Sequence, residues 1–459
     1  MANETPYEDI DQALRGPLIQ PGDDDYDGAR AIYNAMIDKR PGLIVRCADV
    51  ADVITAVNYG REQGLDIAVR GGGHNGPGLA LVDDGLVIDL SGLRGIRVDP
   101  GARTARVEPG CVWGDVDHAT HPFGLATVSG VIGTTGVGGL TLGGGHGYLS
   151  RRYGLTVDNL LAADVVLADG RLVHASEDEN ADLFWALRGG GGNFGVVTSF
   201  LFRLHPVDTV VAGPVFWSLD GLEATMRWYR DWLPGAPETV YALYQCCCIP
   251  PVEPFPEHLH GRNVCGLMFC NTGPEDEALA AVQPAREVAE PLFEHVGPMP
   301  YPVLQSMFDP LYPSGLQWYW KGDFVRELPD AAIAQHARFG DVPTPHSLMH
   351  LYPIDGAVQR VGSDATAFRY RDATWSMVIA GVDEDPANAD SLRDWARAYW
   401  KAVHPHGAGA SYVNFMMEEG ADRVRATYGD NYARLRAIKA KYDPDNLFHV
   451  NQNIEPASR

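Results

Sequence analysis

Three glycine-rich stretches of this sequence carry the side chains that could bind a ligand or react with it. The first runs from Arg70 through glycines 71–73 to His74 and Asn75, directly after an apolar run typical of a strand. Because glycine has no side chain, the backbone N–H groups of a glycine-rich loop can approach an anion closely. A neutral imidazole such as that of His74 is a nucleophile near neutral pH. The stretch predicts a phosphate-cradling loop with a histidine aimed at the ligand; the alternative is a glycine-rich turn with a hydrogen-bonded surface histidine.

The spacing of Gly71, Gly73 and Gly76 fits the G-x-G-x-x-G pattern of nicotinamide dinucleotide crevices, which requires that a helix follow at once. Pro77-Gly78 stops that helix. The third stretch, 189–195, repeats the pattern, but a predicted helix precedes it and a predicted strand follows it. Both stretches therefore favour a flavin or nucleotide fold other than the nicotinamide-binding one.

The second stretch, 130–148, is dense in glycine but also carries Val131, Ile132, Val137 and Leu140. Disorder is the alternative for such a composition. These apolar side chains are too many for a free linker, so we expect an ordered segment that wraps a ligand. Its backbone amides can then meet phosphate and carbonyl oxygens that side chains would obstruct.

The overall composition excludes several classes of protein. Lys and Arg number 36 and Asp and Glu number 60, a net charge of −24, whereas nucleic acid and anionic membrane surfaces need basic patches. No run of eighteen apolar residues predicts a membrane span, and residues 1–10 lack the apolar core of a secretory signal. The 459 residues are enough for two or three domains. We expect a cytoplasmic monomer or homodimer without nucleic-acid or membrane partners.

The seven cysteines form no C-x-x-C pair, so the sequence predicts neither a metal site nor a complete disulfide framework. Cys246, Cys247 and Cys248 lie in a strand-like run. Adjacent strand residues face opposite ways, so these thiols cannot converge on one metal. We expect them to be buried small side chains in a reducing compartment.

Predicted strands and helices place the glycine stretches on loops. A strand at 43–46, a helix that starts behind Asp49 and stops at Gly64, and a strand at 66–70 form a β-α-β unit. That unit delivers the first glycine stretch to the carboxyl end of a strand. A helix over 182–187 precedes the third stretch. Further strands are expected at 86–90, 96–98, 104–107, 160–168, 172–174 and 196–204.

After Pro206 the composition changes: glycine clusters vanish, and Trp, Tyr and Pro become frequent through about residue 409. Strand-like runs alternate there with helical ones, which predicts a second domain built as an antiparallel sheet backed by helices. The expected strands are 215–219, 240–248, 264–270, 316–320, 348–354 and 375–382. The expected helices are 275–290, kinked at Pro284, then 330–338 and 387–403, with another at 431–442 in the tail.

The order of these motifs resembles the berberine-bridge-enzyme-like branch of the vanillyl-alcohol-oxidase (PCMH-type) flavoprotein family, and especially its bacterial 6-hydroxy-nicotine-oxidase-like and polyketide-tailoring oxidases. The resemblance covers the first module and the tail, about half the chain. The matching motifs are Arg70-Gly71-Gly72-Gly73-His74-Asn75, Thr135-Gly136-Val137-Gly138-Gly139, Gly143-Gly144-Gly145-His146-Gly147, Gly190-Gly191-Gly192-Asn193-Phe194-Gly195, Tyr412-x-Asn414-Phe415 and Tyr442-Asp443-Pro444-x-Asn446-x-Phe448.

The resemblance implies an α+β architecture. A PCMH-type FAD-binding domain of two α/β subdomains is joined to a substrate domain with an antiparallel sheet backed by helices, and the tail returns to the FAD domain. We expect an N-terminal extension at 1–36, the FAD-binding domain at 37–208, the substrate domain at 209–409 and the tail at 410–459.

The resemblance further implies FAD held between the glycine stretches. It places His74 at the family's covalent attachment point, where an imidazole nitrogen bonds the flavin 8α-methyl carbon. Doubly linked members carry a cysteine at the position of Ile132, so the resemblance implies a single link through His74 and no cysteinyl bond. The other expected cofactor contacts are Arg70, Gly71, Gly72, Gly73, Asn75, Gly78, Val131, Ile132, Gly133, Thr135, Gly136, Gly138, Gly139, Gly143, Gly145, His146, Tyr148, Asn193, Val197, Asn414 and Asn451.

Tyr412 falls where the family often places a catalytic tyrosine; the alternative is a packed core tyrosine with a satisfied hydroxyl. With an ordinary pKa of about 10, the phenol needs neighbouring donors or a cation to act as a base near pH 7. His350 and Tyr352 share one face of a predicted strand and could supply that help, or could simply pack. Plant members of the family use a glutamate of the second domain in this role, and Arg360 aligns near its position, so the resemblance leaves the identity of the base open.

These residues predict an FAD-dependent oxidase. A base, Tyr412, takes a proton from an alcohol or similar donor, hydride passes to the flavin, and dioxygen reoxidises the flavin to give hydrogen peroxide. An aromatic or polycyclic secondary metabolite is the first choice of substrate, and a sugar is the second. The alternatives are a monooxygenase-like enzyme, with Thr134 and Thr135 shaping an oxygen pocket, and a flavin-bearing binding protein without turnover. The aromatic residues expected to line a substrate pocket, unless they pack in the core, are Trp217, Trp318, Tyr319, Trp320 and Phe324.

Overall fold

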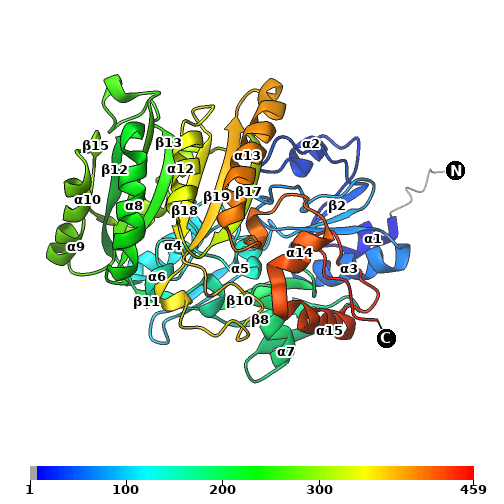
Figure 1. Ribbon diagram of the computed structural model, residues 1–459. Helices are drawn as coiled ribbons and strands as arrows, with labels where there is room; N and C mark the ends of the chain where they lie inside the picture. Colours follow the sequence, from blue (N-terminus) through cyan, green and yellow to red (C-terminus); the bar gives the residue numbers. More distant parts are fainter. Residues whose placement is uncertain (1–7, 459) are drawn as a thin grey trace.

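The computed structural model describes residues 8–458, so residues 1–7 of the predicted N-terminal extension lie outside the described residues. Figure 1 shows a large sheet with helices on its outer face, beside a second lobe built from the first and last parts of the chain. Within residues 8–458, none of the helices combines the length and the apolar character needed to cross a bilayer.

The lobe that contains the first part of the chain begins with a four-stranded sheet in the order β1-β2-β4-β3. Helix α3 (Val50–Gln63) connects β2 (Leu43–Arg46) to β3 (Ile67–Arg70), and both strands run parallel to β4 (Leu86–Asp89) between them. Strand β1 (Leu18–Ile19) pairs antiparallel with β2. This is the predicted β-α-β unit, and it presents the first glycine stretch at the carboxyl end of β3.

Helix α3 has the ends that its sequence predicts. Asp49 accepts hydrogen bonds from the backbone N–H groups of Ala51 at 2.9 Å and Asp52 at 3.2 Å. Gly64 closes the helix in the left-handed conformation, at φ +65°. The buried carboxylate of Asp52 accepts the N–H of Gly16 at 2.9 Å, which fastens the preceding segment to the helix.

A five-stranded antiparallel sheet, in the order β5-β6-β10-β8-β9, completes this lobe. Helix α5 lies inside the second glycine stretch, so that stretch is ordered, as predicted. The strands are β5 (Ile96–Asp99), β6 (Thr104–Val107), β8 (Leu160–Val166), β9 (Leu172–Ser176) and β10 (Val196–Arg203), with the small pair β7 (Leu125–Ala126) and β11 (His205–Pro206). The helices are α1 (Glu8–Ala13), α2 (Tyr26–Arg30), α4 (Trp113–Thr120), α5 (Val137–Gly143), α6 (Ser150–Tyr153) and α7 (Ala181–Leu187).

The other lobe is an eight-stranded antiparallel sheet in the order β15-β12-β14-β13-β18-β19-β17, with β16 beside β12. Helices α8, α12 and α13 cover its outer face (Figure 1). The strands are β12 (Thr209–Ser218), β13 (Val240–Cys248), β14 (Asn263–Asn271), β15 (Phe293–Glu294), β16 (Gly297–Pro300), β17 (Gln317–Val325), β18 (Leu348–Pro353) and β19 (Trp375–Asp383). The helices are α8 (Leu222–Trp232), α9 (Glu275–Ala281), α10 (Gln283–Val288), α11 (Tyr301–Gln305), α12 (Asp330–Phe339) and α13 (Ala389–Val403).

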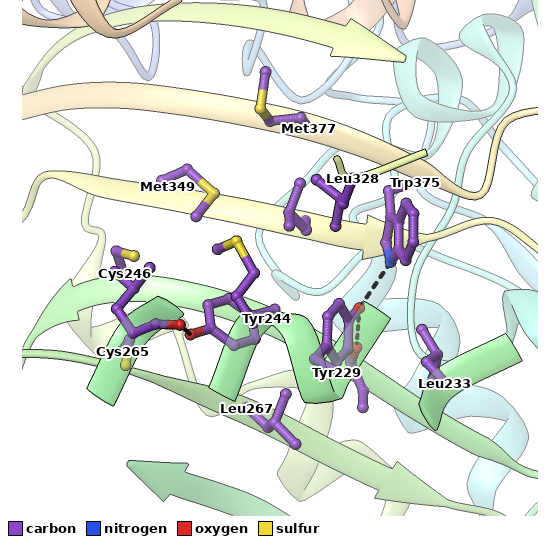
Figure 2. Close-up of a cluster of buried hydrophobic side chains, with 14 of the residues drawn as sticks. Tyr229, Leu233, Tyr244, Cys246, Cys265, Leu267, Leu328, Met349, Trp375 and Met377 are labelled. Atoms are coloured by element: carbon purple, nitrogen blue, oxygen red, sulfur yellow. Dashed lines mark hydrogen bonds between the residues drawn. The ribbon is translucent and has the colours of Figure 1, made fainter. Parts of the chain in front are cut away.

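Figure 2 shows the core between this sheet and its helices. The indole N–H of Trp375 donates to the hydroxyl of Tyr229 at 3.0 Å, and that hydroxyl donates to the carbonyl of Ala242 at 2.8 Å. Cys246 belongs to this core, whereas Cys247 packs in a separate cluster, as the alternation along a strand predicts. All seven cysteines are buried and unpaired, and within residues 8–458 no three His, Cys, Asp or Glu side chains are grouped to hold a metal ion.

The C-terminal tail packs against the first lobe through α14 (Ala421–Tyr428) and α15 (Tyr432–Tyr442). Lys439 is fully buried there, and its ammonium group donates to Asp443 at 2.6 Å. The same group donates to the carbonyls of Asn193 at 2.7 Å and Phe448 at 2.9 Å. The tail is therefore tied to the third glycine stretch.

The sequence patterns do not predict helices α4, α8 and α14. Each of these helices carries aromatic or β-branched residues, which have modest helix propensity. Their sequences therefore give only a weak helical signal. In α8 the buried residues pack on the sheet, a contact formed only in the folded chain. The predicted helix 275–290 is instead two helices that meet at Val282, with Pro284 in the first turn of the second.

Candidate active site

A large cavity lies between the glycine stretches and the inner face of the eight-stranded sheet. It encloses about 2080 Å³ of empty space, a value that includes solvent-open space at its mouth. Backbone of all three glycine stretches lines one end, and residues of β17, β18 and β19 line the other. Within the described part of the chain, no Asp, Glu, Lys or Arg lines the cavity. Anions at the glycine end must therefore be met by uncharged groups such as backbone N–H.

The first two glycine stretches cross at very short range. A Cβ added to Gly136 would lie 2.4 Å from the nitrogen of Gly72, and one added to Gly72 would lie 2.5 Å from the nitrogen of Gly136. A Cβ added to Gly76 would lie 2.2 Å from the ring of Trp320. Because the neighbours are backbone or a packed ring, these positions need glycine for space.

The variant Gly136→Ala is expected to lower the melting temperature and the amount of flavin bound. Its methyl group would force the two crossing segments apart, and overpacking of this kind costs about 1–3 kcal/mol. Gly235→Ala is the matched control, because an added Cβ there meets nothing within 4 Å. Equal melting temperatures and equal flavin content in the two variants would show that the crossing is not tight.

His74 lines the cavity and is half-buried, which favours the predicted ligand-facing histidine over a surface histidine. Its ring stacks on that of Tyr33, with centroids 3.9 Å apart and planes inclined by 15°. The hydroxyl of Thr135 lies 3.5 Å from Nδ1. Burial lowers the pKa of His74 to about 4. The imidazole is therefore neutral at physiological pH and keeps a nucleophilic lone pair.

Tyr412 also lines the cavity, and its hydroxyl oxygen accepts two hydrogen bonds. The N–H of Gly145 donates at 2.9 Å and the amide of Asn414 at 2.8 Å. Burial raises the pKa of Tyr412 above its ordinary value, and these two donors act in the opposite direction. The alternative of a satisfied core tyrosine fits the two bonds, but the hydroxyl hydrogen is left without a bonded acceptor among the described residues.

Two other imidazoles line the cavity. Nδ1 of His350 lies 2.9 Å from the hydroxyl of Tyr352, its neighbour on the same face of β18, as predicted. The ring of His146 lies 5.1 Å from that of Tyr352 and 4.7 Å from that of Tyr412. Burial lowers the pKa of both histidines to about 3. Within the described residues, both nitrogens of His146 and Nε2 of His350 lack a hydrogen-bond partner, which a polar ligand would supply.

Most of the predicted site residues meet at this cavity. Those that line it are Tyr412, Tyr352 and His350, and, among the expected cofactor contacts, His74, Gly71, Gly72, Gly73, Asn75, Val131, Ile132, Thr135, Gly136, Gly138, Gly139, His146, Asn193, Val197, Asn414 and Asn451. Six expected contacts stand behind the wall: Arg70, Gly78, Gly133, Gly143, Gly145 and Tyr148.

The residues behind the wall support it. The guanidinium of Arg70 donates to the carbonyl of Ala29, so it braces the loop from outside. The N–H of Gly133 donates to Asp309 at 2.7 Å, across the boundary between the lobes. Tyr148 is buried in the core. The sequence motifs contain both these residues and the neighbours that line the cavity. Only the folded backbone shows which of them line it and which lie behind the lining residues.

Two of the five residues of the expected aromatic pocket line the cavity. Trp318 and Trp320 line the cavity, whereas the prediction is wrong for Trp217, Tyr319 and Phe324. Trp217 and Tyr319 belong to the core under the helices, and Phe324 packs in a separate cluster. Side chains alternate along β17, so residue 319 faces away from its two neighbours.

Arg360, which aligns near the plant glutamate, does not line the cavity. Its exposed guanidinium pairs with Glu238, with Nη2 2.9 Å from a carboxylate oxygen. The cavity residues that sequence reasoning missed include Tyr33, Phe308 and Tyr312. They belong to no motif; Phe308 and Tyr312 lie in the aromatic-rich part of the chain after Pro206, whereas no sequence signal marks Tyr33.

The glycine end of the cavity fits a flavin dinucleotide. A Cβ on Gly139 or Gly192, both in the wall, would meet nothing within 4 Å, so the backbone there is bare. The hydroxyl of Tyr428 and the amide oxygen of Asn451 are buried in the wall without a partner among the described residues. Bare backbone, orphaned polar atoms and a nucleophilic imidazole define the cofactor cavity of a flavin-dependent oxidoreductase.

Comparison with known proteins identifies the family. Residues 41–176 match the family model described as FAD binding domain, and residues 411–455 match the one described as berberine and berberine like. An FAD-linked oxidoreductase of Dictyostelium discoideum is 30% identical over 97% of this chain and 96% of its own. The chain belongs to the berberine-bridge-enzyme-like family of FAD-linked oxidoreductases, which confirms the resemblance.

Solved structures confirm the fold. The 6-hydroxy-D-nicotine oxidase of Arthrobacter nicotinovorans has a TM-score of 0.87 at 28% identity, over 97% of this chain and 98% of that one. A xylooligosaccharide oxidase from Myceliophthora thermophila has a TM-score of 0.86 at 25% identity, over 98% of this chain and 100% of that one. The mixed architecture with a sheet-rich second lobe is therefore the one predicted.

Proposed function

We propose that this protein is an FAD-dependent oxidase that takes hydride from an alcohol or similar carbon donor on a small, uncharged aromatic or polycyclic metabolite. Bound FAD supplies the hydride acceptor, and dioxygen then takes the electrons to give hydrogen peroxide. The observation that carries the proposal is the sheet end of the cavity, where rings and aliphatic side chains meet neutral imidazoles without a formal charge among the described lining residues. A charged substrate would lose its hydration there without a counter-charge, at a cost on the order of several kcal/mol.

We assign a single covalent link to His74. Its neutral imidazole faces the cavity from the first glycine stretch. Ile132, at the position where doubly linked relatives carry a cysteine, also lines the cavity, and none of the seven cysteines does. These observations support attachment through the histidine without a cysteinyl bond.

We assign the role of base to Tyr412. The N–H groups of Gly145 and Asn414 both point at its oxygen, and they stabilise the phenolate more than the phenol. The hydrogen-bonded pair of His350 and Tyr352 lies on the sheet side of the same cavity. That pair is placed to orient the donor hydroxyl for proton removal.

A sugar oxidase is the second candidate function. One structural neighbour is named a xylooligosaccharide oxidase, and the flat rings of Trp318 and Trp320 would also suit the apolar faces of a sugar. The neighbour named a 6-hydroxy-D-nicotine oxidase favours the first candidate. The small number of polar side chains at the sheet end favours it as well, because a sugar needs many hydrogen-bond partners.

The test is to mix the purified protein anaerobically with candidate donors and follow bleaching of the visible flavin absorbance. A neutral aromatic alcohol is expected to bleach the flavin, and its carboxylate-bearing analogue is not. On admission of air, one hydrogen peroxide should form for each donor oxidised. Bleaching by oligosaccharides alone would select the sugar oxidase. If the reaction is run under isotopically labelled dioxygen, incorporation of the label into the oxidised product would indicate a monooxygenase. If no donor bleaches the flavin, the protein is a binding protein and the proposal fails.

A further inference from the structure

A short segment between α2 and β2 joins the two walls of the cavity. Asn34 is fully buried within it. Its amide nitrogen donates to the carbonyl oxygens of Gly76 at 2.7 Å and Trp318 at 3.0 Å, and its amide oxygen accepts the N–H of Trp318 at 3.0 Å. The segment is thus hydrogen-bonded to the first glycine stretch and to β17 at the same time.

The residue before it, Tyr33, is fixed at both ends. Its backbone N–H donates to the carbonyl of Gly73 at 3.1 Å, and its hydroxyl donates to the carbonyl of Tyr312 at 2.9 Å. One face of its ring stacks on His74, and the ring also lies 5.3 Å from that of Trp318. Tyr33 therefore presents a rigid flat surface to the imidazole.

The imidazole needs such a surface because its own loop cannot hold it. Residues 71–73 and Gly76 are glycines and have no side chain to brace a neighbouring ring. The backbone of Thr134 hydrogen-bonds the imidazole and the hydroxyl of Thr135 lies 3.5 Å from Nδ1, but neither group covers a face of the ring. A ring stacked at 3.9 Å can turn only in its own plane, so its nitrogens stay in that plane.

We propose that Tyr33 is a positioning residue for covalent attachment of FAD: its ring holds the plane of the His74 imidazole so that a ring nitrogen stays aimed at the flavin 8α-methyl carbon. The proposal rests on the single link proposed above. Forming the N–C bond removes one proton from the methyl group and one from the imidazole, and leaves two electrons on the flavin. Dioxygen accepts the two electrons and two protons as hydrogen peroxide. Tyr33 takes no part in this exchange and acts through geometry alone.

The test compares Tyr33→Leu, which removes the flat ring, with Tyr33→Phe, which keeps it and loses only the hydroxyl. Each purified protein is assayed for total bound flavin in the native state and for the fraction that stays in the pellet after acid precipitation. We expect the phenylalanine variant to keep most of the wild-type covalent fraction, because its ring can still stack on His74 although the hydrogen bond to Tyr312 is lost. The leucine variant should bind flavin but retain about one fifth or less of the covalent fraction, a change that a purely structural role would not produce.

Equal covalent fractions in the leucine and phenylalanine variants would overturn the proposal. If the leucine variant does not fold, Tyr33→Met keeps the side-chain volume without a flat face and takes its place under the same criteria. Wild-type protein that releases all its flavin into the supernatant would instead refute the His74 link itself. The two failures are therefore distinguishable.

Discussion

Replacing His74 with alanine is expected to move the flavin from the acid-precipitated pellet to the supernatant. The proposed bond from the imidazole would survive denaturation, whereas noncovalent contacts with the glycine stretches are lost when the chain unfolds. The alanine variant should still bind FAD in the native state, because the bare backbone of the cavity remains. The measurement is the distribution of flavin absorbance and fluorescence between pellet and supernatant, and the expected change is from nearly all covalent to none.

His146→Ala is the matched control for this experiment. His146 is the other imidazole borne on a glycine stretch; it lines the same cavity, and burial lowers its pKa as it does that of His74. The control should therefore keep its flavin in the pellet even if its activity changes. Covalent flavin in His74→Ala, or its loss in His146→Ala alone, would show that the attachment point has been assigned to the wrong histidine.

The second large effect is expected for Tyr412→Phe, measured as the rate at which a working donor bleaches the flavin under anaerobic conditions. Loss of a general base costs about 10²–10⁴-fold in rate. Because burial raises the pKa of Tyr412, the phenol is mostly protonated at neutral pH, and the active phenolate becomes more abundant as pH rises. The wild-type rate should accordingly increase with pH, and the phenylalanine variant should lose that increase.

Tyr241→Phe serves as the comparison. Tyr241 is buried on β13 and does not line the cavity, and its hydroxyl has no hydrogen-bond partner among the described residues. Its removal tests the cost of deleting a buried hydroxyl alone, and the rate and its pH dependence should stay as in the wild type. A Tyr412→Phe variant that bleaches at the wild-type rate with the wild-type pH profile would remove Tyr412 from the mechanism.

Much of the fold is predictable from the sequence because the relevant forces are local. Helix α3 begins and ends where Asp49 and Gly64 can satisfy free backbone groups or adopt the left-handed conformation. The glycine stretches predict exposed backbone N–H and C=O groups in any fold, because glycine has no side chain to cover them. The motif of His74 and the departure at Ile132 likewise stand in the sequence, and so do the class of cofactor and the family.

The details of the site depend on contacts between distant parts of the chain, which local patterns do not encode. Alternation along β17 puts Tyr319 on the face opposite to Trp318 and Trp320, but which of the two faces meets the cavity follows from how the sheet packs on the other lobe. Among residues 8–458, the absence of Asp, Glu, Lys and Arg from the cavity wall is a property of residues gathered from both lobes and the tail. The stack of Tyr33 on His74 joins residues 41 positions apart, and it exists because Asn34 holds its segment between the lobes. The sequence thus determined many of the strands and helices, the cofactor and the family, whereas packing decided which side chains face the cavity, because burial and stacking arise only when the lobes close on each other.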